Sequence, residues 1–239
     1  MTPGGLAVAT GTAASSRAIA RIAALARAPA PLLVVCDFDG TLAVGSRDPA
    51  AAAIVPLAQR SLRRLARIAA ERPGRVTVAV LTGRTVTDVA SRVRVGGINY
   101  LGDHGLQRGT FARGGGPGQV SASFGRGHED SHAPAERLAS GVPEVLGRPD
   151  WLFVERKGPS VAFHVRMAED RLAARAAVEA AIATVDAQTP RHDLAHYRGR
   201  LVVDLRPRTA GGKREALEML LTELRPGSVV AFGDDSSDA

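Results

Sequence analysis

Short, largely apolar runs alternate with longer stretches of helical periodicity along this chain of 239 residues. Four runs are bounded by glycine, proline or polar residues, which is typical of strands buried on both faces of a sheet. They lie at 32–36, 76–81, 98–101 and 229–232. Stretches with apolar residues on one helical face lie at 50–72 (interrupted near Pro56), 87–95 and 213–224. Strands that alternate with helices predict an α/β fold with a parallel, doubly wound sheet.

The pattern changes at about Gln107, where a stretch rich in glycine, serine and arginine begins (108–132). This stretch is either a flexible loop or the ragged first hairpin of an inserted domain. Alternating apolar and polar positions at 160–166 then predict a strand of an antiparallel sheet with one exposed face. Further strands are expected at 151–155 and 201–205, and helices at 134–146 and 168–187. We therefore expect an inserted α+β cap domain at 107–206, a core domain at 31–106 and 207–239, and an N-terminal helical extension at 1–30.

Polar signatures follow three of the predicted core strands, namely Asp37-Phe-Asp39, Thr82-Gly-Arg84 and Gly233-Asp-Asp235. The carboxyl ends of parallel strands meet at one edge of a sheet, so we expect these side chains to converge. Carboxylates that converge repel one another unless a hard cation lies among them, and oxygen ligands favour Mg²⁺. Lys213 opens a predicted helix and faces an anion in this arrangement. The set suits phosphoryl transfer, whereas an Asp-x-Asp pair alone is equally explained by an Asp-rich turn.

Composition limits the alternatives. With 45% hydrophobic and 23% charged residues, the chain is typical of soluble globular proteins. No apolar run approaches the roughly 20 residues that span a bilayer, so we expect no membrane association. The single cysteine, Cys36, excludes an internal disulfide and fits a reducing, cytoplasmic location.

The net charge of +7 points to an anionic partner. The basic residues are scattered and aromatic residues make up only 4%, so we expect a phosphorylated small molecule and no nucleic acid. Of 31 basic residues only Lys157 and Lys213 are lysines. These two positions are candidates for a site that needs a compact ammonium group.

Four segments in this order resemble the motifs of the haloacid dehalogenase (HAD) superfamily of phosphatases: DFDGTL, LTGR, the isolated Lys213 and GDDSSD. The resemblance covers about 31–105 and 207–239, and it implies a Rossmann-like HAD core with an inserted cap. It further implies that Asp37 attacks phosphorus and forms an aspartyl-phosphate. Asp39 then protonates the leaving alcohol and activates water, while Thr82 and Lys213 hold phosphate oxygens.

The same resemblance implies a Mg²⁺ cofactor. Its expected ligands are Asp37, the backbone carbonyl of Asp39 and Asp234, supported by Asp238 or Asp235.

Other residues resemble the trehalose-6-phosphate phosphatases. They are Gly102-Asp-His-Gly105 and Glu155-x-Lys157-Gly with the following SVAFHVR. By this resemblance Glu155 and Lys157 contact the sugar, since charged groups make several hydrogen bonds to hydroxyls. An ion pair across a hairpin turn is the alternative explanation.

Three further residues are expected to bind the substrate: Arg84, His104 and His164. His104 could equally anchor the backbone. His164 and Arg166 could equally be ordinary residues of an exposed strand.

The sequence departs from the family pattern at its end, where Ser237 replaces threonine and Ala239 replaces glutamate. The family continues through another helix and at least one strand, so we expect either a truncated chain or elements that are dispensable here.

The expected function is Mg²⁺-dependent hydrolysis of trehalose 6-phosphate by a monomeric, cytoplasmic enzyme. The alternatives are another HAD sugar phosphatase, acting on sucrose phosphate, a glucosylglycerol-type phosphate or a Cof-like range of substrates, and a non-catalytic regulatory homologue.

Overall fold

A computed structural model describes residues 12–28, 31–45, 48–125, 127–188, 193–199 and 201–234 of the chain. The chain divides into two compact units. The core unit comprises Met1–Gly45, Ala53–Ala122 and Gly212–Ala239, and the cap unit comprises Ser46–Ala52 and Ser123–Gly211. No helix among the described residues has both the length and the apolar character needed to cross a membrane.

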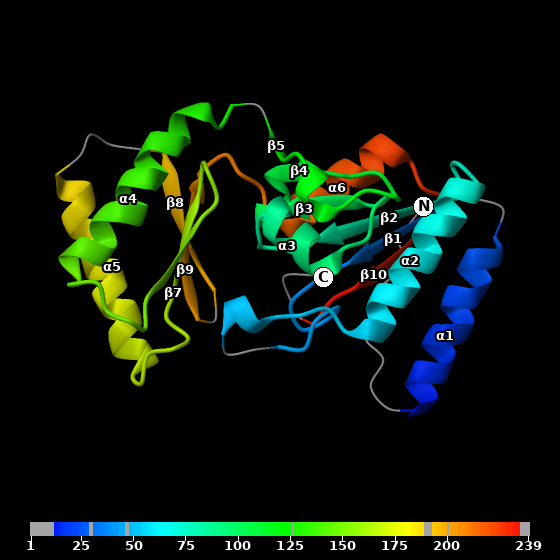
Figure 1. Cartoon of the computed structure of the whole chain (residues 1–239), viewed down its shortest axis with the longest axis horizontal. Helices are drawn as coiled ribbons and strands as arrows, with labels where there is room; N and C mark the ends of the chain where they lie inside the picture. Colours follow the sequence, from blue (N-terminus) through cyan, green and yellow to red (C-terminus); the bar gives the residue numbers. More distant parts are fainter. Residues whose placement is uncertain are drawn as a thin grey trace. The chain divides into compact units, whose positions relative to one another are not determined.

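The core unit contains a parallel sheet, as the alternation of strands and helices predicted (Figure 1). Its strands are β1 (Leu32–Cys36), β2 (Val76–Leu81), β3 (Asn99–Gly102), β4 (Gln107–Gly109) and β10 (Ser228–Phe232). Their order is β10-β1-β2-β3-β4, and only β4 runs antiparallel to its neighbour. All five residues of β1 are buried, because β1 has a hydrogen-bonded strand on each side and apolar cover on both faces.

The helices of the core unit are α1 (Thr12–Arg27), α2 (Pro56–Glu71), α3 (Val86–Val93) and α6 (Lys213–Leu224), with 3₁₀ turns at Asp103–Gly105 and Pro117–Gln119. Of these, α2 packs on β2, α3 packs on β3, and α6 packs on the sheet as well. A further 3₁₀ turn, Pro49–Ala51, belongs to the cap unit. Ala216 and Leu220 of α6 pack on Leu33, Val35 and neighbouring side chains of the sheet. The alternate side chains of the strands, such as Val34 and Val78, are buried as well. The helical face predicted over 213–224 therefore has the partner that its apolar residues require.

The division between the units differs from the expected boundary at 106/107. Residues 107–122 belong to the core unit, because β4 pairs with β3 as a short antiparallel extension of the sheet. Tyr100 of β3 also stacks on Phe111, with ring centroids 5.9 Å apart. The stretch that read as either a loop or a hairpin thus begins as a strand of the core.

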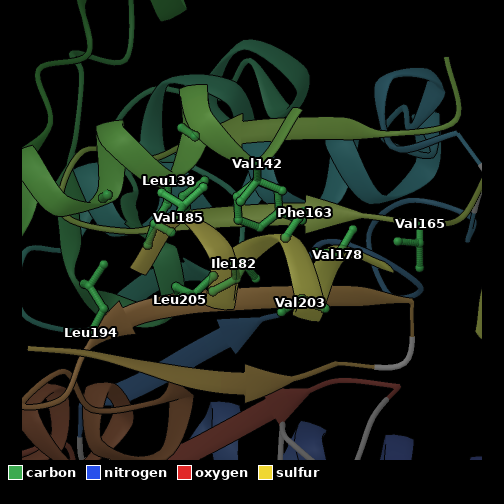
Figure 2. Packing of buried hydrophobic residues seen from close by; sticks show 14 of the residues in the cluster. Leu138, Val142, Phe163, Val165, Val178, Ile182, Val185, Leu194, Val203 and Leu205 are labelled. Atoms are coloured by element: carbon green, nitrogen blue, oxygen red, sulfur yellow. The ribbon is translucent and has the colours of Figure 1, made fainter. Parts of the chain in front are cut away.

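The cap unit is an antiparallel sheet covered on one face by two helices. Its strands are β6 (Phe153–Arg156), β7 (Val161–His164), β8 (Leu194–Arg198) and β9 (Val202–Pro207), in the order β6-β7-β9-β8. Its helices are α4 (His132–Val145) and α5 (Arg171–Ala187), and shorter elements lie at Ser123–Phe124 (β5) and Glu129–Ser131. Figure 2 shows the core between them, in which Phe163 and Val203 of the sheet meet Val142 of α4 and Ile182 of α5.

One strand of the cap was missed. We assigned no structure to the polar stretch that contains His192 and His196, yet residues 194–198 form β8 and pair with β9. Leu194 is the buried apolar residue of this edge strand. Its partner strand, rather than its own sequence, therefore fixes its structure. His192 lies outside the described residues.

Candidate active site

The parallel strands of the core unit end at the same edge of the sheet, where polar residues follow them. The backbone N–H of Asp37, just after β1, donates to the carbonyl of Phe232 at the end of β10 over 2.9 Å. The N–H of Thr82, just after β2, donates to the carbonyl of Leu101 in β3 over 3.0 Å. Segments that are far apart in sequence thus supply one polar edge.

Asp37 and Lys213 form a buried ion pair at this edge. The Nζ atom of Lys213 lies 2.6 Å from Oδ1 of Asp37, and the two side chains are 11% and 5% exposed. Lys213 is the first residue of α6, and the N–H of Gly212 just before it donates to Oε2 of Glu215 over 2.7 Å. Loss of either partner leaves an uncompensated buried charge, so the two residues are strongly coupled.

The loop after β2 is held by the loop after β3 through main-chain hydrogen bonds. The N–H of His104 donates to the carbonyl of Thr82 over 2.9 Å, and the N–H of Asp103 donates to the carbonyl of Arg84 over 2.7 Å. This close approach requires Gly102, because a Cβ there would lie 2.5 Å from a backbone nitrogen of the facing loop. Thr82 itself is buried, and its Oγ1 accepts from the N–H of Arg84 over 3.2 Å.

His104 anchors this loop with its backbone, which is one of the two roles that the sequence left open. Its φ of 58° lies in the left-handed region, and a Cβ on Gly83 would come 2.9 Å from Nε2 of its ring. The imidazole therefore packs against the glycine between Thr82 and Arg84. A contact between His104 and the substrate stays a prediction.

Arg84 directs its guanidinium at two carboxylates. Its Nε and Nη2 each donate to one oxygen of Asp39, and both distances are 2.8 Å. Its Nη1 donates to Oδ2 of Asp88 over 2.8 Å, and the guanidinium carbon lies 5.4 Å from the centroid of the Phe38 ring. Burial lowers the pKa of Arg84, but Asp39 and Asp88 outweigh burial and hold this pKa above its usual value. Arg84 thus holds Asp39 in place, and its expected contact with the substrate stays a prediction.

Asp88, which the sequence analysis missed, connects Arg84 to α3. Its N–H donates to Oγ1 of Thr85, the N-cap of α3, over 3.2 Å, and its carboxylate accepts from Nε of Arg92 over 2.9 Å. Burial raises the pKa of Asp88, but hydrogen bonds from Arg92 and Arg84 outweigh it and leave the pKa lowered. The i, i+4 spacing of Arg84, Asp88 and Arg92 was the signal available in the sequence.

The expected metal ligands are partly described. Asp234, after β10, lies against the loop after β1, since a Cβ on Gly40 would come 2.0 Å from its Oδ2. Asp37 and Asp234 thus supply carboxylates to the same loop, together with the backbone carbonyl of Asp39, and this oxygen set fits Mg²⁺. Within the described residues, no three His, Cys, Asp or Glu side chains form a group that could hold a metal ion. Asp235 and Asp238 lie outside those residues.

A row of opposite residues that contains two carboxylates crosses the cap sheet. Directly opposite positions in neighbouring strands are Glu155, Ala162, Asp204 and Tyr197. Opposite residues share a face of the sheet, and the next row packs into the core beneath α4 and α5. That core row includes Val154, Phe163 and Val203. Glu155 and Asp204 therefore lie on the face away from these helices.

Lys157 lies between the two acidic residues of this row. Its Nζ is 3.8 Å from Oε2 of Glu155 and 3.5 Å from Oδ1 of Asp204, and only 4% of the residue is exposed. Nε2 of His164 is 3.0 Å from the same oxygen of Glu155. Arg206 completes the group, with its Nε 3.2 Å from Oδ2 of Asp204. The pair expected across a hairpin turn is thus part of a larger buried network, which we call the cap cluster.

Asp204 and Arg206 were missed because the stretch 201–205 was interpreted only as a strand. Their period-two spacing places both side chains on one face, and the guanidinium of Arg206 lies 3.7 Å from the centroid of the Tyr197 ring. Lys157 and Lys213, the only lysines of the chain, are each paired with buried carboxylates, one in the cap cluster and one at the core edge. The unusual use of lysine was therefore an informative signal.

Comparison with known proteins agrees with the motifs. The family model of the trehalose-phosphatases matches residues 35–239. A trehalose-phosphate phosphatase of Mycobacterium bovis is 34% identical over 225 residues, which cover 90% of this chain and 50% of that protein. Its Mycobacterium avium counterpart is 35% identical over 218 residues, which cover 86% of this chain and 49% of that protein. The chain thus spans about half the length of the curated relatives it matches.

Solved structures share the fold at lower identity. The C-terminal domain of trehalose-6-phosphate phosphatase from C. albicans superposes with a TM-score of 0.65 at 19% identity, covering 87% of this chain and 70% of that chain. A haloacid dehalogenase-like hydrolase from Bacteroides thetaiotaomicron gives a TM-score of 0.51 at 13% identity, with 87% and 83% covered. These structures confirm the predicted α/β fold of the HAD type. The matching family model and the Mycobacterium relatives show that the chain belongs to the trehalose-phosphatase family.

Proposed function

We propose that this chain hydrolyses trehalose 6-phosphate to trehalose and phosphate through an aspartyl-phosphate on Asp37. The observation that carries the proposal is the buried pair in which Oδ1 of Asp37 lies 2.6 Å from Nζ of Lys213. A nucleophilic carboxylate beside an ammonium group suits attack on a phosphoryl group, because the ammonium receives the negative phosphate oxygens. Membership of the trehalose-phosphatase family supports the choice of sugar.

In the first step a carboxylate oxygen of Asp37 forms a bond to phosphorus while the bond between phosphorus and the sugar oxygen breaks. Asp39 gives a proton to the departing oxygen. In the second step Asp39 takes a proton from water, whose oxygen attacks phosphorus and releases Asp37. Lys213 and the hydroxyl of Thr82 hold phosphate oxygens in both steps, which keeps the reacting groups aligned.

Arg84 sets the starting position of Asp39 in this scheme. Both carboxylate oxygens of Asp39 accept hydrogen bonds from Arg84, so neither oxygen donates a hydrogen bond in this arrangement. At least one of these bonds must open, and that oxygen must take up a proton from solvent, before Asp39 can donate the proton to the leaving oxygen. The Asp39 side chain is 40% exposed, so it has room to turn without unpacking its neighbours.

The metal is part of the proposal. Asp37, Asp234 and the backbone carbonyl of Asp39 would hold Mg²⁺, and the ion would offset the negative charge that gathers at the phosphoryl group. The contact of Asp234 with Gly40 supports this ligand set.

We assign recognition of the sugar to the cap cluster. This cluster contains Glu155, Lys157, His164 and Asp204. Lys157 pairs with both Glu155 and Asp204, and His164 pairs with Glu155, so carboxylates and an ammonium group alternate over a few ångströms. Such a set offers both acceptors and donors to hydroxyl groups. Its members are held by one another, which limits the conformational entropy lost on binding.

The decisive experiment is phosphate release from a panel of sugar phosphates, each with Mg²⁺ or with EDTA. We expect trehalose 6-phosphate to be turned over fastest and EDTA to stop the reaction. Comparable rates on sucrose phosphate and other esters would replace the trehalose assignment with a general sugar phosphatase. Absence of turnover on every ester would favour a regulatory, binding role. The expected monomeric state and cytoplasmic location stay predictions, checked by light scattering and by cell fractionation.

A further inference from the structure

A cavity of about 390 Å³ in the core unit is lined by four arginines, and none of the lining residues in the described part of the chain is acidic. Arg63, Ala66 and Arg67 of α2 form one wall, and the turn after α3 (94–96) and the loop at 113–115 form the others. None of the lining residues belongs to the proposed catalytic set. The volume lies in the range of roughly 300–1,000 Å³ that is typical of sites for small ligands.

The local structure brings the four guanidinium groups together. Arg63 and Arg67 are four residues apart and share one face of α2, where the buried Ala66 leaves space between them. Arg94 ends α3 in the left-handed conformation, with a φ of 53°. Arg113 lies over Gly97, since a Cβ on that glycine would come 3.5 Å from its side-chain carbons.

The walls around Arg94 and Arg113 are tightly packed. A Cβ on Gly96 would lie 2.1 Å from the carbonyl oxygen of Ala112, so the two loops touch through their backbones. The N–H of Gly97 donates to the carbonyl of Phe111 over 2.8 Å, which joins the same loops. These backbone contacts fix the main chain that carries Arg94 and Arg113, whereas Arg63 and Arg67 are carried by α2, and all four side chains are exposed.

The charges of these arginines are poorly compensated within the part of the chain that the structure describes. Arg67 has a single carboxylate neighbour, Glu71, at 3.9 Å, and both side chains are more than half exposed. Arg94 donates to the carbonyl of Ser91 over 3.0 Å, and no carboxylate pairs with Arg63 or Arg113. Like charges around one cavity repel one another, so an anion that enters it is stabilised by all four.

We propose that this arginine pocket binds a small anion with two or more phosphate charges, separately from the catalytic edge. Guanidinium forks bind phosphate oxygens in pairs, and a ligand with two or more phosphate charges compensates four arginines better than a single carboxylate does. No aromatic side chain lines the pocket, so it lacks the stacking surface that a nucleobase or single-stranded nucleic acid would use.

Pyrophosphate is the probe, titrated into the full chain by calorimetry in EDTA, so that metal-assisted binding at the catalytic edge is suppressed. Arg63→Gln with Arg113→Gln should weaken pyrophosphate binding by at least about tenfold. The same double variant should keep its unfolding temperature and its rate of phosphate release from trehalose 6-phosphate. Arg60→Gln with Arg64→Gln removes the same charge from exposed positions of α2 outside the pocket, and it should bind pyrophosphate like wild type.

A third variant separates this site from the catalytic one. Lys213→Met should retain pyrophosphate binding, because Lys213 lies outside the pocket. Loss of binding in Lys213→Met would place the anion at the catalytic edge and overturn the proposal. Equal weakening in both arginine double variants would reduce it to nonspecific charge attraction, and absence of binding by wild type would also overturn it.

Discussion

Arg84 donates a hydrogen bond to each carboxylate oxygen of Asp39, although the two residues are 45 positions apart in the sequence. The third nitrogen of the same guanidinium is taken by Asp88. Asp39 is thus held by a planar fork whose own position is fixed from α3. Such a contact sets the orientation of the proposed acid and base.

We expect Arg84→Lys to lower kcat by about tenfold to a hundredfold with little change in KM for trehalose 6-phosphate. Lysine keeps the charge but lacks the two parallel donors that orient Asp39. Steady-state kinetics with trehalose 6-phosphate measures both constants. Arg92→Lys is the matched control, because Arg92 contacts Asp88 and not Asp39, and its kinetics should resemble wild type. A rise in KM at unchanged kcat would return Arg84 to substrate binding.

Asp37→Asn should abolish phosphate release while the chain stays folded. Asparagine has nearly the same shape and its carbonyl can accept from Lys213, but it cannot form the acyl-phosphate. Phosphate release and the thermal unfolding midpoint are the measurements. Asp150→Asn, at an exposed position of the cap unit, serves as control and should keep full activity. Wild-type turnover by Asp37→Asn would remove the proposed nucleophile.

Lys157→Met should raise KM for trehalose 6-phosphate by about tenfold or more and leave kcat on p-nitrophenyl phosphate unchanged. The small ester lacks the sugar that the cap cluster is proposed to recognise. Methionine keeps the length of the buried stem, and Glu155→Gln provides a second variant that disturbs packing less.

Arg156→Met is the control for the cap. Its side chain donates to Glu136 of α4 over 3.1 Å, so it lies on the helix-covered face of the same sheet. We expect normal KM in this variant. Normal KM in Lys157→Met and Glu155→Gln as well would reduce the cap cluster to a structural network.

Asp88 should make the stability of the core unit depend on acidity. Its pKa is lowered in the folded chain, so the unfolded chain binds the proton more readily. The stabilisation is therefore complete above the ordinary aspartate pKa of 3.8 and is lost as pH falls below it. With the side chain 31% exposed, we expect less than about 1 kcal/mol.

Urea unfolding at neutral pH and at about pH 3 tests this pH dependence of stability. Asp88→Asn should reduce the loss of stability between the two conditions. Asp193→Asn, which removes an exposed partner of Arg208, should not reduce it. An identical acid dependence in wild type and Asp88→Asn would contradict the assignment.

Cys36 should resist thiol reagents in the native chain and react fully in denaturant. It is 5% exposed in β1, and burial together with Asp37 raises the pKa of its thiol to about 12. Labelling followed by mass measurement at increasing urea reports the opening of this strand. Rapid labelling of the native chain would show that β1 opens locally.

The sequence was sufficient for elements whose own residues specify them. β1 is an uninterrupted apolar run and β2 has Thr77 as its single polar residue, and α6 begins at Lys213 as predicted because two glycines precede a regular helical pattern. β8 was missed, since a short edge strand depends on its neighbour for its structure. The polar edge of the core could be predicted because the alternation of strands and helices indicates parallel strands, whose carboxyl ends lie at one edge of the sheet.

Pairings between distant side chains could not be predicted in this way. The bonds between Arg84 and Asp39, and between Lys157 and Asp204, depend on strand register and on the direction of long side chains. Residue spacing places such groups on a face but does not select their partners. Arg84 was therefore assigned to the substrate, and Asp204 was left without a role.

The main-chain bonds from Asp103 and His104 to the loop of Thr82 and Arg84 have a mechanical consequence. A displacement of the end of β3 would therefore move two groups together. One is the hydroxyl of Thr82, which is proposed to hold phosphate, and the other is Arg84, which holds the carboxylate of Asp39. Mild heating or a strained substitution at Gly102 should then slow the formation and the hydrolysis of the proposed aspartyl-phosphate together. We expect no accumulation of a phosphorylated chain that is formed but not hydrolysed. The end of β3 thus couples the positions of Thr82 and Arg84, and the proposed phosphatase activity should be lost in one transition rather than in stages.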